Sequence, residues 1–286
     1  MSQEETVGVD STYHPTYLGA DTQAYEEWCC TLAADSKFRR YELEPWGNFM
    51  KVGPKLEWYV CNEQGYRSKY SWGQTPRFLQ AGYPMDEEPF VMNLANRIEN
   101  EFGEKVNHAI LKWYADGVEQ SSPPHQDKAD GVKGATADKC DMAREGSFYV
   151  FSFGYAREFT VQRGNGVPNA GKNEKSLDPS DVVWQKALAS GSLLKISAED
   201  NRTLYHALHK SKGAGERWSL IFRVIQTCIP VDPIVATEVN DAMYRFVSKA
   251  QVNAGYGAPT HTALQAFAKQ QSSFTTAPQR KRAREA

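Results

Sequence analysis

The chain has 286 residues, of which 41% are hydrophobic and 24% are charged, and its formal net charge is -2. These values suit one large globular domain, or a domain with appendages, and exclude a disordered chain. No apolar run approaches the roughly 20 residues of a membrane span. The opening MSQEETVGVD is acidic and has no apolar run, so we expect no secretory signal and an intracellular protein. The five cysteines form no CxxC pair, which indicates neither a disulfide framework nor a thiolate zinc site.

Two helices are predicted ahead of a run of strands. Apolar residues recur at helical spacing near 21–35 and again near 87–102. Short β-branched or aromatic runs then predict strands at NHAILKWY, SFYVFSFG, REFTVQ, SLLKIS and RWSLIFRVI. Helices followed by strands indicate an α+β fold with a core built from strands.

The segments between and after these strands are polar. Residues 163–186 are rich in Gly, Asn, Pro and Lys and predict a flexible excursion between two strands. Residues 234–250 predict a late amphipathic helix, and the hydrophobic content falls from residue 251 onward. The basic tail PQRKRAREA (278–286) would suit a nuclear localisation signal or a phosphate-binding arm. The alternative is an ordinary solvated chain end.

Positive charge and aromatic residues gather in residues 37–77. This stretch carries eight Lys or Arg against four Glu, interleaved with nine aromatic residues. Cationic side chains beside aromatic faces are what a phosphate backbone and an unstacked base both need. The alternative is the rim of a core with ordinary solvated charges.

The stretch SSPPHQDKADG (121–131) places His125 and Asp127 two residues apart behind two prolines. An extended backbone, which Pro123 and Pro124 favour, points both side chains to the same side. One further histidine would complete the 2-His-1-carboxylate triad, whose open positions take a co-substrate and dioxygen at Fe(II). By itself the H-x-D pair is a weak signal, and an ordinary polar loop is the alternative.

A third ligand and an anion site are both suggested by residues 203–223, TLYHALHKSKGAGERWSLIFR. His206 and His209 are the candidate ligands, and Arg217, Ser219 and Arg223 share one face of the strand that follows. Two guanidinium groups on an inward face are costly without anions, which a dicarboxylic acid would supply. They stand roughly 20 Å apart along an extended strand, so they would bracket a ligand. An exposed edge with solvated arginines is the alternative.

In this order, these motifs resemble those of the AlkB family of Fe(II)/2-oxoglutarate dioxygenases, over about residues 54–225. The similar segments are GPKLEWY and EQGYRSKYS, in the position of the family's nucleotide lid, then ILKWYADGVEQSSPPHQDKAD, FSFGYAREF, GSLLKI, and YHALHK with RWSLIFR. Each segment is modest by itself, and their common order carries the resemblance. It implies a double-stranded β-helix, or jelly-roll, core with supporting N-terminal helices.

The resemblance also implies roles for individual residues. His125, Asp127 and His206 would bind Fe(II), with His206 preferred over His209 because the family's ligand follows an aromatic residue. The residues expected to hold the co-substrate 2-oxoglutarate are Arg217 at its distal carboxylate, Arg223 near the end that chelates iron, Tyr114 as a hydrogen-bonding group, and the pocket positions Lys112 and Ser219.

Substrate contacts are expected from the lid, about residues 37–85. Tyr66 matches an aromatic residue that helps to hold the substrate nucleotide, and Tyr59 or Trp58 would stack on the base. The bacterial prototype has a base-reading Asp where this chain has Ala129, with Asp130 one place later, which leaves the base preference open.

Two further departures lie in the co-substrate pocket. The family has Asn where this chain has Lys112 and Ser219, so the hydrogen bonding of the pocket must differ in detail.

The implied activity is oxidative demethylation of N-alkylated bases in DNA or RNA, in which dioxygen hydroxylates an N-methyl group that then leaves as formaldehyde. The alternatives are a hydroxylase of a protein or small molecule, a catalytically silent binding module, and a sugar- or anion-binding β-barrel.

We expect the protein to be a monomer with three parts. These are an N-terminal extension at residues 1–20, a dioxygenase domain at 21–230 with its catalytic core at about 105–228, and a C-terminal extension at 231–286.

Overall fold

A computed structural model describes residues 4–34, 85–117, 120–127, 142–143, 145–164, 178–213 and 215–225 with their side chains. It also gives the backbone of the strands within 39–84 and at 228–230 and 244–247. Among these residues, none of the helices combines the length and the apolar character that crossing a bilayer requires.

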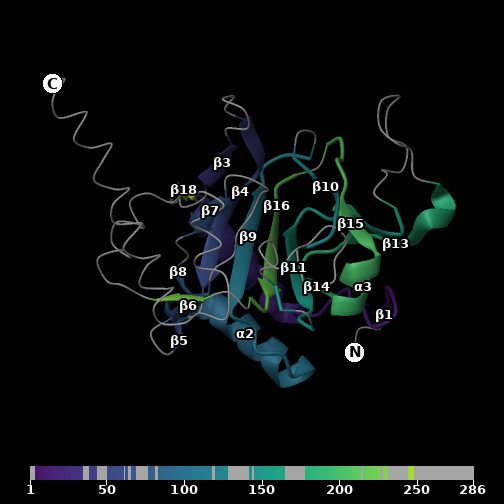
Figure 1. The fold of residues 1–286 in the computed structure, drawn as a ribbon. Helices are drawn as coiled ribbons and strands as arrows, with labels where there is room; N and C mark the ends of the chain where they lie inside the picture. Colours follow the sequence, from purple (N-terminus) through teal and green to yellow (C-terminus); the bar gives the residue numbers. More distant parts are fainter. Residues whose placement is uncertain are drawn as a thin grey trace.

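A nine-stranded sheet forms the main layer of the fold (Figure 1). In spatial order its strands are β1 (Glu5–Thr6), β2 (Thr12–His14), β14 (Ser192–Ile196), β11 (Phe148–Gly154), β16 (Arg217–Arg223), β9 (His108–Tyr114), β4 (Met50–Val60) and β3 (Arg39–Leu43), with β8 (Tyr83–Pro84) paired to β4. Within the described chain every strand pair of this sheet is antiparallel except β4 with β8.

A four-stranded antiparallel sheet faces the main one. Its order is β10 (Ser122–His125), β15 (Tyr205–Leu208), β12 (Arg157–Gln162) and β13 (Val182–Leu188). Side chains from both sheets share one apolar core, for example Ile110 and Val150 from the main sheet with Val161 and Leu208 from the smaller one. The site described below lies between these two facing sheets.

Two helices cover the other face of the main sheet. They are α1 (Thr22–Ala34) and α2 (Pro89–Phe102), and their apolar sides share a second core with Phe151, Leu220 and Phe222 of that sheet. The central strands are therefore buried on both faces, which explains why RWSLIFR is buried throughout. Helix α2 begins with Pro89 and is followed by the C-cap residue Gly103, whose φ of 72° suits glycine.

The remaining elements are short. They are helix α3 (Ala198–Thr203), a sheet of β17 (Cys228–Pro230), β6 (Tyr66–Ser68) and β5 (Asn62–Glu63), and the pair β18 (Tyr244–Val247) with β7 (Arg77–Gln80). Short 3-10 helices lie at Gly19–Asp21, Met85–Glu87 and Pro179–Asp181. The structure thus consists of antiparallel sheets with few helices, and the two predicted N-terminal helices and all five predicted strands are present.

Three expectations need correction. The helix predicted at 234–250 is wrong at Tyr244–Val247, which forms a strand; aromatic and β-branched residues favour strands, and a run this short does not separate the two periods. The excursion predicted at 163–186 ends earlier, because β13 begins at Val182 and pairs with β12. Strands also precede and separate the two helices, so the order is not helices first. Residues 165–177, 231–243 and 248–286, with the basic tail, lie outside the described residues.

Candidate metal and co-substrate site

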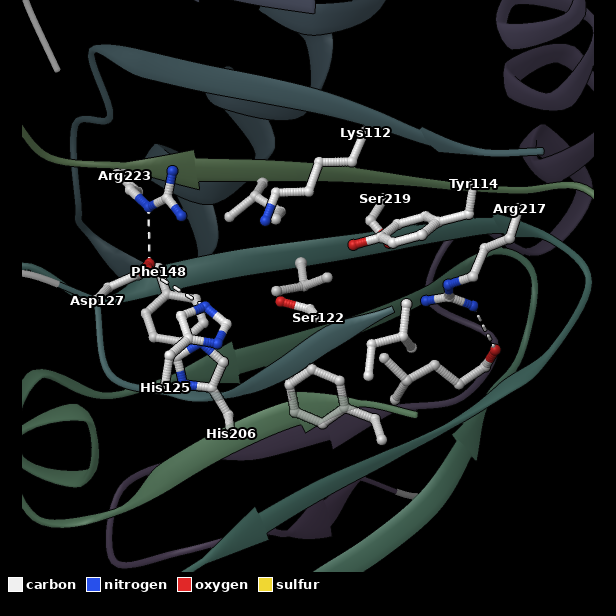
Figure 2. A pocket seen from close by; sticks show the side chains of 15 residues that line it. Lys112, Tyr114, Ser122, His125, Asp127, Phe148, His206, Arg217, Ser219 and Arg223 are labelled. Carbon is white, nitrogen blue, oxygen red and sulfur yellow. Dashed lines mark hydrogen bonds and ion pairs between the residues drawn. The ribbon is translucent and has the colours of Figure 1, made fainter. Parts of the chain in front are cut away.

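Three candidate metal ligands meet at one end of a cavity between the sheets (Figure 2). His125, Asp127 and His206 each offer a ligand atom, and these atoms all lie within 4.8 Å of one another. His125 ends β10, and its Cα partner across the antiparallel ladder is His206 of β15. The two imidazole centroids are 4.2 Å apart, so the pairing of these strands is what brings together residues 81 positions apart in the chain.

The environment leaves one nitrogen of His125 free for a metal. Its Nδ1 lies 2.7 Å from the carbonyl oxygen of Pro123, which an N–H at Nδ1 would satisfy. The other nitrogen, Nε2, points toward Asp127 Oδ1 at 3.8 Å. A hydrogen bond of this kind to the far nitrogen is the usual way in which proteins orient a metal-binding imidazole.

Aromatic rings hold the His206 side chain. Phe159 stacks on its imidazole at a centroid distance of 6.0 Å, and Phe148 lies 4.9 Å away. Burial lowers the pKa of His206 well below its ordinary value, and the neighbouring His125 lowers it further. The imidazole is therefore neutral near neutral pH, which is the form that binds a metal.

The two oxygens of Asp127 have different surroundings. Oδ2 accepts a hydrogen bond from Arg223 Nε at 2.8 Å, and Oδ1 faces His125. Burial alone would raise the pKa of this carboxyl, but the positive charge of Arg223, the nearby His206 and His125 and the hydrogen bond from Arg223 together outweigh burial and hold the pKa well below its usual range. The carboxylate is therefore ionised, with one oxygen directed at the point where the three ligand atoms converge.

The opposite end of the cavity holds a buried cation. Arg217 is fully buried and donates to the carbonyl oxygen of Leu188 at 3.2 Å and to Ser152 Oγ at 2.7 Å. No carboxylate among the described residues pairs with it. Burial lowers the pKa of Arg217 only to about 10, so it stays charged at neutral pH. A buried charge without a counterion is costly, which favours an anionic ligand at this end.

The cavity encloses about 410 Å³, part of it open to solvent. Apolar side chains from both sheets line it together with polar and charged ones. The polar and charged residues are Lys112, Tyr114, Ser122, His125, Asp127, His206, Arg217, Ser219 and Arg223. Burial lowers the pKa of Lys112 to about 8 and raises that of Tyr114 to about 12. Three cationic side chains therefore face a single carboxylate, an excess of positive charge that suits a dicarboxylate.

All eight predicted metal and co-substrate residues thus line this cavity. His209 does not: its Nε2 lies 2.8 Å from Thr160 Oγ1, in the smaller sheet. The predicted substrate contacts Tyr66, Tyr59 and Trp58 lie in strands whose side chains are not described, and Asp130 lies outside the described residues altogether.

The sequence alone did not point to two further residues beside the cavity. Arg157, buried in β12, donates from Nη2 to the carbonyl oxygens of Gln120 and His209, and its guanidinium lies 5.3 Å from the centroid of the Tyr114 ring. Asn201, in α3, binds the backbone of Asp127. Arg157 lies within the segment FSFGYAREF, where the resemblance assigned it no role, and Asn201 lies outside the similar segments. Each contacts a residue at least 37 positions away, which local spacing does not reveal.

No protein-family model and no curated protein matches the sequence. Among solved structures, OsALKBH1 is similar at a TM-score of 0.46 and 17% identity, over 77% of this chain and 100% of that one. A prolyl-4-hydroxylase from Pseudomonas putida is similar at a TM-score of 0.41 and 15% identity, over 75% and 92% of the two chains. The function proposed below therefore rests on the residues of the cavity and on the sequence motifs.

Proposed function

We propose that this protein is an Fe(II)/2-oxoglutarate-dependent dioxygenase that demethylates N-alkylated bases in DNA or RNA. The observation that carries the proposal is the convergence of two imidazoles and one carboxylate at one end of a cavity whose other end holds the buried Arg217. This donor set suits Fe(II), because it binds one face of the ion and leaves positions open. The two facing antiparallel sheets suit the double-stranded β-helix that the sequence motifs imply.

Residues at one end of the cavity would bind the metal, and a residue at the other end would bind the co-substrate. His125, His206 and Asp127 Oδ1 would hold the metal, while Arg223 keeps the carboxylate ionised and turned toward it. Arg217 would hold the distal carboxylate of the co-substrate. When bound, iron with 2-oxoglutarate and dioxygen supplies the oxidising chemistry that hydroxylates a C–H bond.

Residues of β9 and β16, which line the cavity from the main sheet, would orient the co-substrate between these two ends. Tyr114 lies opposite Arg217 across the β9–β16 ladder, and Lys112 lies opposite Ser219. With a pKa of about 12, the Tyr114 hydroxyl keeps its proton at neutral pH and can donate a hydrogen bond to an anion. The apolar rings of Phe148 and Phe159 would exclude water around the ligand histidines.

Nucleic acid is the proposed substrate because basic and aromatic residues interleave over 37–77, where the sequence resembles a nucleotide lid. A base in a duplex must first be flipped out, at a cost of about a few kcal/mol that is smallest for damaged or single-stranded sites. Single-stranded oligonucleotides with an N-methylated base are therefore the first substrates to test.

The test measures succinate release from 2-oxoglutarate with Fe(II) and ascorbate, and loss of the methyl group by mass spectrometry. The methylated oligonucleotide is compared with its unmethylated counterpart and with a prolyl peptide, and His125→Ala is the inactive control. We expect release to depend on iron and to rise with the methylated strand. Release that rises only with the peptide would refute the nucleic-acid substrate, and no release under any condition would refute the dioxygenase.

A further inference from the structure

The side chain of Asn201 holds Asp127 through both polar groups of its backbone. The backbone N–H of Asp127 donates to Asn201 Oδ1 at 2.9 Å, and Asn201 Nδ2 donates to the carbonyl oxygen of Asp127 at 3.0 Å. Asn201 is 1% exposed, so neither bond competes with bulk water. One amide side chain therefore satisfies the same two groups that a neighbouring strand would satisfy.

This support matters because Asp127 lies beyond its strand. β10 ends at His125, so ladder pairing positions the histidine ligand but not the carboxylate ligand two residues later. A further hydrogen bond ties this segment to α3, from Gln126 Nε2 to the carbonyl oxygen of Arg202 at 2.9 Å. The direction of the Asp127 side chain thus depends on a backbone that α3 holds.

Helix α3 is itself anchored at its N-terminal end and through its middle. Its N-cap, Ser197, accepts a hydrogen bond from the backbone N–H of Asp200, and the Asp200 carboxylate accepts from Ser11 Oγ and from the backbone N–H of Val9. Three residues after α3, His206 lies in β15. One short helix therefore connects the N-terminal segment, the carboxylate ligand and the second histidine ligand.

We infer that Asn201 is a positioning residue that sets the metal affinity of the site by holding Asp127 in its binding geometry. The inference rests on the proposed function only in requiring that the three ligands bind a metal. Loss of a residue that orients a ligand typically weakens metal binding by about 10–100-fold.

The chain offers a matched control for this role. Asn107 makes the same pair of bonds to another residue: its Nδ2 donates to the carbonyl oxygen of Ile225 at 2.8 Å, and the N–H of Ile225 donates to its Oδ1 at 2.7 Å. Neither Asn107 nor Ile225 lines the cavity. Asn107→Ala therefore removes a comparable side-chain to backbone pair without touching a ligand, and neither alanine variant introduces a charge.

The experiment titrates Co(II) into the full-length chain without co-substrate and follows its visible absorption, which reports both affinity and ligand geometry. We expect Asn201→Ala to bind about 10–100-fold more weakly than the unsubstituted chain, with an altered spectrum, and Asn107→Ala to bind as the unsubstituted chain does. Urea unfolding of both variants shows whether they are folded; if Asn201→Ala is not, Asn201→Ser replaces it.

Equal Co(II) affinity and identical spectra for the Asn201 and Asn107 variants would overturn the inference and leave the proposed function standing. Failure of the unsubstituted chain to bind Co(II) would overturn the proposed function, and the inference with it. Turnover is not needed for either result.

Discussion

Arg223→Met should destabilise the protein strongly, because it leaves a buried carboxylate without its partner. Asp127 and Arg223 are 4% and 3% exposed, and a 2.8 Å hydrogen bond joins them. Breaking such a buried pair by removing one member costs about 3–5 kcal/mol, since the remaining charge stays out of water. The loss would be a large part of the total free energy of unfolding, which is about 5–15 kcal/mol for typical proteins.

The double variant Asp127→Asn with Arg223→Met tests the reasoning, because removing both charges removes the uncompensated one. Its free energy of unfolding should exceed that of Arg223→Met alone, although it carries one more substitution. The assay is urea unfolding at neutral pH with a metal chelator, followed by the fluorescence of the seven tryptophans. A double variant no more stable than Arg223→Met would show that the carboxylate is not the source of the loss.

The pH dependence provides a second check on the same pair. In the folded protein the pKa of Asp127 lies below its ordinary value of 3.8, so this carboxylate stabilises the fold above that pH, and the contribution is lost as the pH falls. Without Arg223, burial raises the pKa of Asp127 above its ordinary value. Protonation of Asp127 then removes the uncompensated buried charge and stabilises the variant. The difference in stability between the two proteins should therefore begin to shrink above pH 3.8, where the variant's folded state takes up a proton, and shrink further below pH 3.8, where the native pair loses its contribution. A difference that is constant with pH would contradict the electrostatic explanation.

Three further predictions concern the cavity. His125→Ala should abolish Co(II) binding and succinate release, and retained metal binding would remove this residue from the ligand set. Arg217→Gln should raise the 2-oxoglutarate concentration required for half-maximal succinate release by about 10–100-fold, because a hydrogen bond to a charged group is worth about 1.5–3 kcal/mol; an unchanged requirement would refute its role. Affinity for 2-oxoglutarate should fall as the pH rises through about 8, where Lys112 loses its proton. Isothermal titration should show this fall diminished in Lys112→Met, and an equal fall in both proteins would assign it to another group.

The amino-acid sequence by itself determined the features that depend on neighbouring residues. Apolar spacing placed both helices that cover the main sheet, and the alternation in RWSLIFR put Arg217 and Arg223 on one face because strand side chains alternate. The i, i+2 spacing of His125 and Asp127 likewise predicted that both point the same way, since an extended backbone has a period of two.

Only the tertiary structure decided which distant groups meet. Arg223 pairs with Asp127 across 96 positions, and Asn201 holds the same residue across 74. Strand Tyr244–Val247 likewise forms by pairing with Arg77–Gln80, where local pattern predicted a helix. Such contacts depend on strand register and on the packing of two sheets, which the short-range periodicity of a sequence does not encode. The candidate ligands could therefore be proposed from motifs, whereas the residues that hold them in place became visible only in the folded chain.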